Sequence, residues 1–191
     1  GFMSVGAFTG IVVSQSLLDS VTSAPVRLAI AMVVGAIFAA IVGLLIGTPV
    51  LRLQGDYLAI VTLACGEIIK ELINCLIIGH DENGLHFIFN PAGNKTVDDL
   101  GLSATGTAII KGAQGATGTA TIATFTAGFI LVMITLIVVL NLTRSRAGRA
   151  IMAIRDNRIA AESVGIDITK YKLLAFSVSA ALAGTAGVLY A

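Results

Sequence analysis

The stretch VRLAIAMVVGAIFAAIVGLLIGTPV, residues 26–50, decides the fold class, because it carries no charge after Arg27. An α-helix rises about 1.5 Å per residue, so about 20 apolar residues cross a hydrocarbon core roughly 30 Å thick. Within this stretch Gly35, Ala39, Gly43 and Gly47 recur every four residues and fall on one helix face. A face of small residues lets another helix approach closely. The stretch therefore predicts a membrane-spanning helix that packs against a neighbouring helix.

The composition extends this reading to the whole chain. Of its 191 residues 56% are apolar and 12% charged, with a mean hydropathy of +0.94. A soluble domain has about 25% charged residues, so too few charges are present to cover a water-facing surface. We therefore expect an all-α, polytopic transmembrane helix bundle forming one domain over residues 1–191. Its expected spans cover residues 2–18, 26–50, 57–78, 121–142 and 173–191.

The positive charges predict how this bundle is oriented. Seven of the twelve Lys and Arg residues lie between 144 and 172, whereas residues 79–120 contain only Lys95 and Lys111. Loops rich in Lys and Arg stay in the cytoplasm. We expect residues 143–172 to be cytoplasmic and residues 79–120 to form an extracytoplasmic loop. This loop is rich in Gly, Thr, Asn and Asp, which favours an excursion containing short strand or helix pieces.

The cytoplasmic segment contains signals for a short amphipathic helix. Asp156 or Asn157 can cap its start, Gly165 can end it, and Asp167 can cap the next membrane helix. A helix of about two turns is not stable alone, so its apolar residues need a partner surface. Ile159 and Val164 are among those residues. Either another protein or the lipid headgroups could provide that surface, and the periodicity leaves both open.

Several strings, in order, resemble the branched-chain amino-acid permease family of ABC importers. They are LRLQGDYLAIVTL (51–63), GEII (66–69), SRAGRA (145–150), AAESVGI (160–166), YKLLAF (171–176) and SAALAGTAGVLYA (179–191). With the run that joins the later strings, they cover about a third of the chain, and they imply a fragment truncated at both ends. The wider importer motif is Glu-Ala-Ala, three residues, then Gly; here Ile159 replaces the Glu. The stretch GHDENG (79–84) departs most, where the family has a Gly-Gly-Pro-Asn-Gly-like sequence.

The resemblance implies a transport subunit that is not itself an enzyme, and it assigns residues 143–172 as the loop that couples to an ATPase. The coupling residues are then Arg155, Asp156, Asn157, Ile159, Ala160, Ala161, Glu162 and Gly165. The implied partners are a second permease subunit, two ATP-binding subunits and an extracytoplasmic solute-binding protein in a bacterial-type inner membrane. The implied substrates are leucine, isoleucine and valine, or related small polar solutes. ATP and magnesium belong on the partner subunits, because this sequence has no Gly-rich phosphate loop.

Three charges interrupt the expected span 57–78, namely Glu67, Lys70 and Glu71. A charge at the membrane centre costs at least about 2.5–3.5 kcal/mol, which makes these residues candidates for the translocation pathway. They could contact a zwitterionic substrate or gate the pathway; alternatively, a tilted helix turns them toward water or another subunit. Gly35, Gly43, Gly47, Gly184 and Gly187 are candidate helix-packing positions, either pivoting or static.

Other functions fit the sequence less well. A secondary, ion-coupled transporter would need no coupling loop and would carry inverted repeats, of which we find no convincing second copy. A purely structural membrane scaffold would tolerate changes within 155–165. No metal site is expected, since the spacing of His80, Asp81, Glu82 and His86 fits no strong zinc pattern. The basic run 144–172 lies between membrane spans, so we expect it to contact anionic lipid and not nucleic acid.

Overall fold

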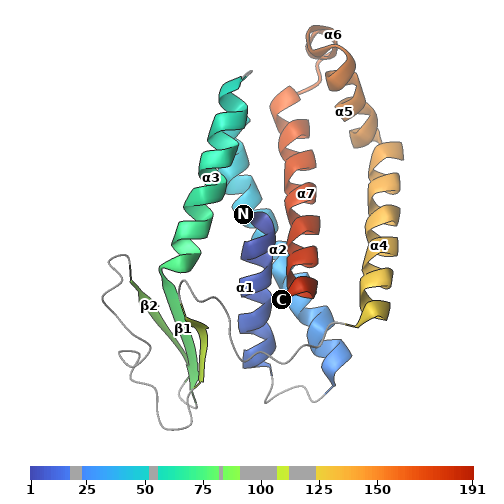
Figure 1. The fold of residues 1–191 in the computed structure, drawn as a ribbon. Coiled ribbons are helices and arrows are strands. Elements are labelled where there is room, and N and C mark those ends of the chain that lie inside the picture. The colour runs from blue at the N-terminus through green and yellow to red at the C-terminus, as the bar shows by residue number, and fades with distance from the viewer. Residues whose placement is uncertain (18–22, 52–55, 82–83, 91–106, 112–123) are drawn as a thin grey trace.

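The computed structural model describes residues 1–17, 23–51, 56–81, 84–90, 107–111 and 124–191. Three helices form its core: α1 (Phe2–Ser16), α2 (Ala24–Val50) and α7 (Ile168–Tyr190). Helices α3 (Asp56–Asn74) and α4 (Phe125–Arg144) flank this core on opposite sides (Figure 1). Two shorter helices, α5 (Arg146–Asp156) and α6 (Arg158–Ser163), lie at one end, and a small β-sheet lies at the other. The predicted polytopic helix bundle is confirmed.

Three of the described helices are long and apolar enough to cross a membrane, namely α2, α4 and α7. Helix α1 is apolar but has 15 residues, and α3 carries the charges of Glu67, Lys70 and Glu71. The spans expected at 2–18 and 57–78 therefore stay predictions. Residues 18 and 121–123, at the edges of two expected spans, lie outside the described part of the chain.

Two helices begin before the expected membrane spans, and local chemistry explains both; for α7 the cap predicted at Asp167 marks the start. Helix α2 begins at Ala24 and so includes Pro25, which its first turn tolerates because no intrahelical N–H bond is needed there. Helix α7 begins at Ile168, five residues before the expected span 173–191. The Asp167 carboxylate accepts a hydrogen bond from the Lys170 backbone N–H (3.1 Å) and so fixes this start.

The helix expected over 57–78 is shorter in the structure, because its last residues join a sheet. Helix α3 ends at Asn74, and β1 (Leu76–Asp81) pairs antiparallel with β2 (Gly84–Phe89) and with β3 (Thr107–Lys111). The β-branched Ile77 and Ile78 favour a strand, where they lie opposite Ile88 and Phe87 of β2. The strand order is β2-β1-β3, with an irregular register in β1 between Ile78 and Gly79.

This sheet is fixed to the end of α1 by apolar contacts. Ile78 is buried against Phe8, Ile11 and Val12 of α1. The loop expected over 79–120 thus contains strand residues; its residues 82–83, 91–106 and 112–120 lie outside the described ranges. His80, Asp81 and His86 fall in the strands, and Glu82 is outside the described residues. Among the described residues, no group of three or more potential ligands could hold a metal ion.

Glycines let the backbones of α1 and α7 touch. A Cβ added to Gly6 would overlap the carbonyl oxygen of Gly184, and one added to Gly187 would overlap the carbonyl oxygen of Met3. At the same interface Phe2 packs edge-on against Phe176, with ring centroids 5.4 Å apart. Because backbone atoms cannot move aside as a flexible side chain does, these two helices are interlocked at Gly184 and Gly187.

The small-residue face of α2 packs on the same helix. Gly35, Ala39, Gly43 and Gly47 are all buried. A Cβ on Gly43 would lie 2.7 Å from the Cβ of Ala180, and one on Gly47 would lie 2.9 Å from carbons of Leu173 and Phe176. A Cβ on Gly35 would lie 3.3 Å from the carbonyl oxygen of Gly6. All three core helices therefore meet near Gly35, where each contacts the other two.

Candidate functional site

The turn from α4 into α5 depends on Ser145 and Gly148. The Ser145 hydroxyl accepts a hydrogen bond from the Gly148 N–H (3.1 Å) and caps the start of α5. A Cβ on Gly148 would overlap the carbonyl oxygen of Leu142, so only glycine fits this close approach. Sequence reasoning missed α5 as a separate helix. The signals were Ser145 as a cap and apolar residues at 150, 151 and 154, spaced to share one helix face.

Helix α6 begins and ends at the residues that the sequence predicted. The Asn157 side chain accepts a hydrogen bond from the Ala160 N–H (3.1 Å) and caps the start of α6, whereas Asp156 is the last residue of α5. Gly165 adopts φ +84°, and the next N–H, that of Ile166, donates to the carbonyl of Ala161 (3.1 Å). A glycine in this left-handed conformation is the common way to end a helix. The prediction of these two signals is confirmed.

A buried apolar cluster joins α6 to its two neighbours. Ile154 of α5, Ala161 of α6 and Ile168 of α7 are all buried and pack together, with Ile166 and Tyr171 against them. Ala161 is 4% exposed, so it faces this cluster and not a partner. A cap, a left-handed glycine and this buried cluster therefore anchor α6 to α5 and α7.

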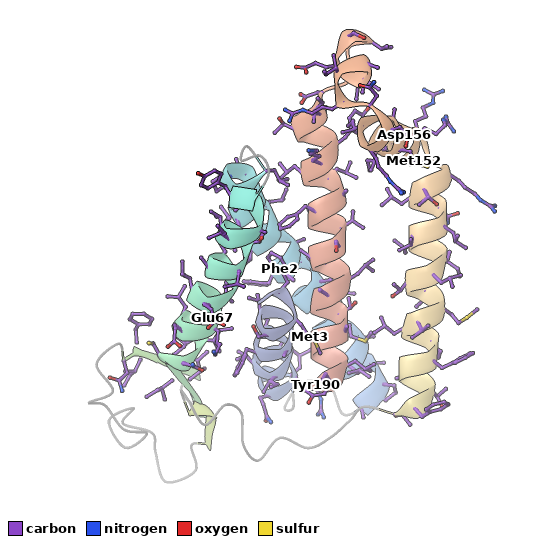
Figure 2. All side chains as sticks on the ribbon, turned by 45° about the horizontal axis from the view of Figure 1, so that its top comes forward. Phe2, Met3, Glu67, Met152, Asp156 and Tyr190 are labelled. Carbon is purple, nitrogen blue, oxygen red and sulfur yellow. The ribbon has the colours of Figure 1, made fainter. Side chains whose placement is uncertain are left out.

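Large apolar side chains are exposed at this end, among charged ones. Ile159 and Val164 are each 80% exposed, and Met152 is 45% exposed. The other coupling residues predicted from the resemblance are also exposed; they are Arg155, Asp156, Asn157, Ala160, Glu162 and Gly165. Figure 2 shows Met152 and Asp156 on α5, beyond the end of α4. We call Ile159, Val164 and Met152 the apical surface.

The three charges of α3 lie on a face that points away from the core. Lys70 Nζ is 3.0 Å from Glu67 Oε2, and both side chains are 60% exposed. Glu71 is exposed as well, whereas Ile69 is buried and packs near Gly1. Glu67 lies on the half of α3 next to the strands (Figure 2). A charged face cannot stay in hydrocarbon at low cost, so it faces water or another protein.

The structure keeps the two candidate regions apart. The apical surface lies at the α5–α6 end of the molecule, and Glu67 lies toward the sheet end (Figure 2). They are connected through the core, because α6 is fixed to α7 and α7 packs on α1, which contacts α3.

One charged residue was not predicted as notable: Arg27, in the first turn of α2, is only 9% exposed. A single Arg at the start of an apolar run gives no signal in the sequence that it will be buried.

Comparison with known families decides the assignment. The family described as "Branched-chain amino acid transport system / permease component" matches residues 1–191. The chain belongs to this family. It is therefore a multi-pass membrane protein, as the resemblance of its sequence strings indicated.

Two curated members of this permease family are similar over the whole chain. The high-affinity branched-chain amino acid transport system permease protein LivM of Escherichia coli (strain K12) is 36% identical over 198 residues. The protein of the same name from Salmonella typhimurium (strain LT2) is 34% identical over 198 residues. The chain spans 44% of the length of each relative. No solved structure matches it.

Proposed function

We propose that this chain is part of the membrane subunit of an ATP-driven importer, and that its apical surface binds a separate ATP-binding subunit. The observation that carries this proposal is the exposure of Ile159 in α6 and of Val164 directly after it, on a segment that a buried cluster joins to α7. Helix α6 lies beyond the ends of both α4 and α7 (Figure 1). This position favours a protein partner over lipid headgroups, since the apolar side chains are held away from the spans.

The packing suggests how a force on α6 reaches the membrane. Helix α7 continues from α6 through the Asp167 cap and the buried cluster. Its backbone lies against that of α2 at Gly184 and against that of α1 at Gly184 and Gly187. Interlocked backbones move together more easily than they slide. We therefore favour movement of α1, α2 and α7 as one unit, with displacement at the more sparsely packed α3 and α4.

The charged face of α3 is our proposed part of the translocation pathway. An α-amino acid carries one ammonium and one carboxylate group, and Glu67 and Lys70 present one charge of each sign, 3.0 Å apart. Glu71 adds a second carboxylate on the next residue. The substrate would exchange these ion-pair partners for its own charged groups as it passes. A second permease subunit would complete the pathway opposite this face.

The substrate class rests on the relatives. Their names state high-affinity transport of branched-chain amino acids, and we propose leucine, isoleucine and valine for this chain. The predicted orientation places the sheet on the extracytoplasmic side of a bacterial-type inner membrane, where a solute-binding protein would deliver the substrate. In this assembly ATP and magnesium would bind to the partner subunits.

Replacing Ile159 tests the proposal. In the full-length subunit, expressed with its transport partners, Ile159→Glu should reduce co-purification of the ATP-binding subunit at least about tenfold. Burial of an isoleucine contributes about 1.5–3 kcal/mol, and about 1.4 kcal/mol is a factor of ten. Ile159→Met is the matched control and should retain binding. Leucine uptake should fall with co-purification.

Two outcomes would contradict the proposal. Equal co-purification of the Glu and Met variants would show that the apical surface is not the binding surface. Uptake that persists after the ATP-binding subunit is lost would instead support a secondary transporter. Because Ile159 is 80% exposed, neither variant should disturb folding.

A further inference from the structure

Two cationic side chains meet in a pocket between α5 and α7. The pocket has a volume of about 370 Å³ and is lined by Ile151, Ile154, Arg155 and Lys172. Lys172 is half-buried there, whereas Lys170, one half-turn earlier on α7, is exposed. Within residues 124–191, which the structure describes without a gap, no carboxylate forms an ion pair with either cation. The pocket therefore presents two positive charges beside an apolar wall.

An apolar groove runs between α4 and α7, farther from that end of the molecule. It has a volume of about 590 Å³, and its lining includes Leu136, Val139 and Leu140 of α4 and Leu182 and Ala186 of α7. Leu182 is ten residues beyond Lys172, which is about 15 Å along a helix axis. That distance is half of a hydrocarbon core about 30 Å thick. A phospholipid has a charged headgroup at the membrane interface and acyl chains that reach to mid-membrane. The cationic pocket and the apolar groove are placed to bind these two parts.

We propose that Arg155 and Lys172 bind the phosphate of an anionic phospholipid from the cytoplasmic leaflet, with its acyl chains in the α4–α7 groove. Basic pockets at the cytoplasmic ends of transmembrane helices recognise anionic headgroups. The planar Arg guanidinium suits two phosphate oxygens, and the Lys ammonium adds a point charge. Ile151 and Ile154 provide the apolar wall beside the glycerol region. The proposal needs the predicted orientation, but it does not depend on the ATP-binding subunit.

Such a lipid would link α5 to α7 directly beneath the apical surface. Ile154 belongs both to the pocket and to the buried cluster that holds α6. A phosphate between Arg155 and Lys172 would remove the repulsion between these two cations. The end of the molecule that carries the apical surface should therefore be better ordered in membranes that contain anionic lipid.

The test counts bound lipid on the full-length subunit with its partners. The complex is placed in nanodiscs of equal phosphatidylglycerol and phosphatidylcholine, extracted gently, and examined by native mass spectrometry. Arg155→Gln with Lys172→Gln should reduce retained phosphatidylglycerol about thirtyfold, since each basic residue near an anionic surface contributes about fivefold. The control, Arg158→Gln with Lys170→Gln, removes the same charge from exposed positions and should retain the lipid.

Further arms separate the possible sources of the phosphate. Leu140→Trp fills the groove and should displace the phospholipid, whereas inorganic phosphate in large excess should not. Equal lipid retention by the two charge variants would overturn the proposal. The proposal would also be overturned if inorganic phosphate displaced the phospholipid and Leu140→Trp did not. That result would indicate a site for free phosphate. Loss of the ATP-binding subunit with unchanged lipid would also overturn it and assign the cations to protein contact.

A single substitution at the exposed Arg155 provides a second test if the double variant is not produced in folded form. Arg155→Gln alone should lower phosphatidylglycerol retention about fivefold relative to Arg158→Gln. Equal retention by these two single variants would overturn the proposal on its own.

Discussion

The contact at Gly184 gives a prediction whose magnitude follows from the packing. In Gly184→Ala the new Cβ would lie 2.5 Å from the Cβ of Ala39 and 2.9 Å from the carbonyl oxygen of Gly35. Ordinary contacts need about an ångström more, so α2 and α7 must separate. Overpacking of this kind costs about 1–3 kcal/mol. Alanine recovers up to about 1 kcal/mol because it is the better helix former. We expect a net loss of up to about 2 kcal/mol.

Gly66 provides the matched control. It lies in α3, where an added Cβ meets nothing within 4 Å. Gly66→Ala should therefore be neutral or stabilising by up to about 1 kcal/mol. The assay is the midpoint of thermal unfolding of the full-length subunit in detergent, followed by size-exclusion chromatography. A midpoint for Gly184→Ala equal to or above that of Gly66→Ala would refute the close packing of α2 on α7 at Gly184.

Three further predictions concern the site residues. Gly165→Ala should destabilise the α6–α7 turn by about 1–2 kcal/mol, because φ is +84° there. Faster hydrogen exchange of the Ile166 N–H would report this loss, and Gly165→Asn should show a smaller effect. Asn157→Ala should cost about 1 kcal/mol of local stability and speed exchange of the Ala160 N–H, whereas Asn157→Asp keeps the cap. Lys70→Ala should change leucine uptake while leaving the free energy of unfolding nearly unchanged, because its ion pair is exposed; unchanged uptake would remove Lys70 from the pathway.

The sequence predicted those features that depend on residues close together in the chain. The caps at Asn157 and Asp167 and the left-handed Gly165 each involve partners within five residues, and all three are present. The long apolar runs likewise specify helices by their length alone. Local chemistry of this kind can be read from one sequence without knowing what packs against it.

Features that depend on distant residues were not predictable in the same way. The spacing of Gly35 and Gly43 indicated a helix interface but not that α1 and α7 share it with α2. Ala161 was expected in a docking surface, yet it is buried because Ile154 and Ile168 close over it. The end of α3 at Asn74 depends on the pairing of β1 with β2 and β3, which no short-range signal specifies.

The central claim is that the α6 end of this permease chain contacts an ATP-binding subunit, and cysteine cross-linking tests it most directly. In full-length protein with Cys65 and Cys75 replaced by alanine, Val164→Cys is compared with Phe125→Cys in native membranes. Phe125 is 89% exposed at the other end of α4, so it reports nonspecific reaction. The account predicts a cross-link from position 164 to the ATP-binding subunit and none from position 125. No cross-link from position 164, or equal cross-linking from both positions, would contradict it.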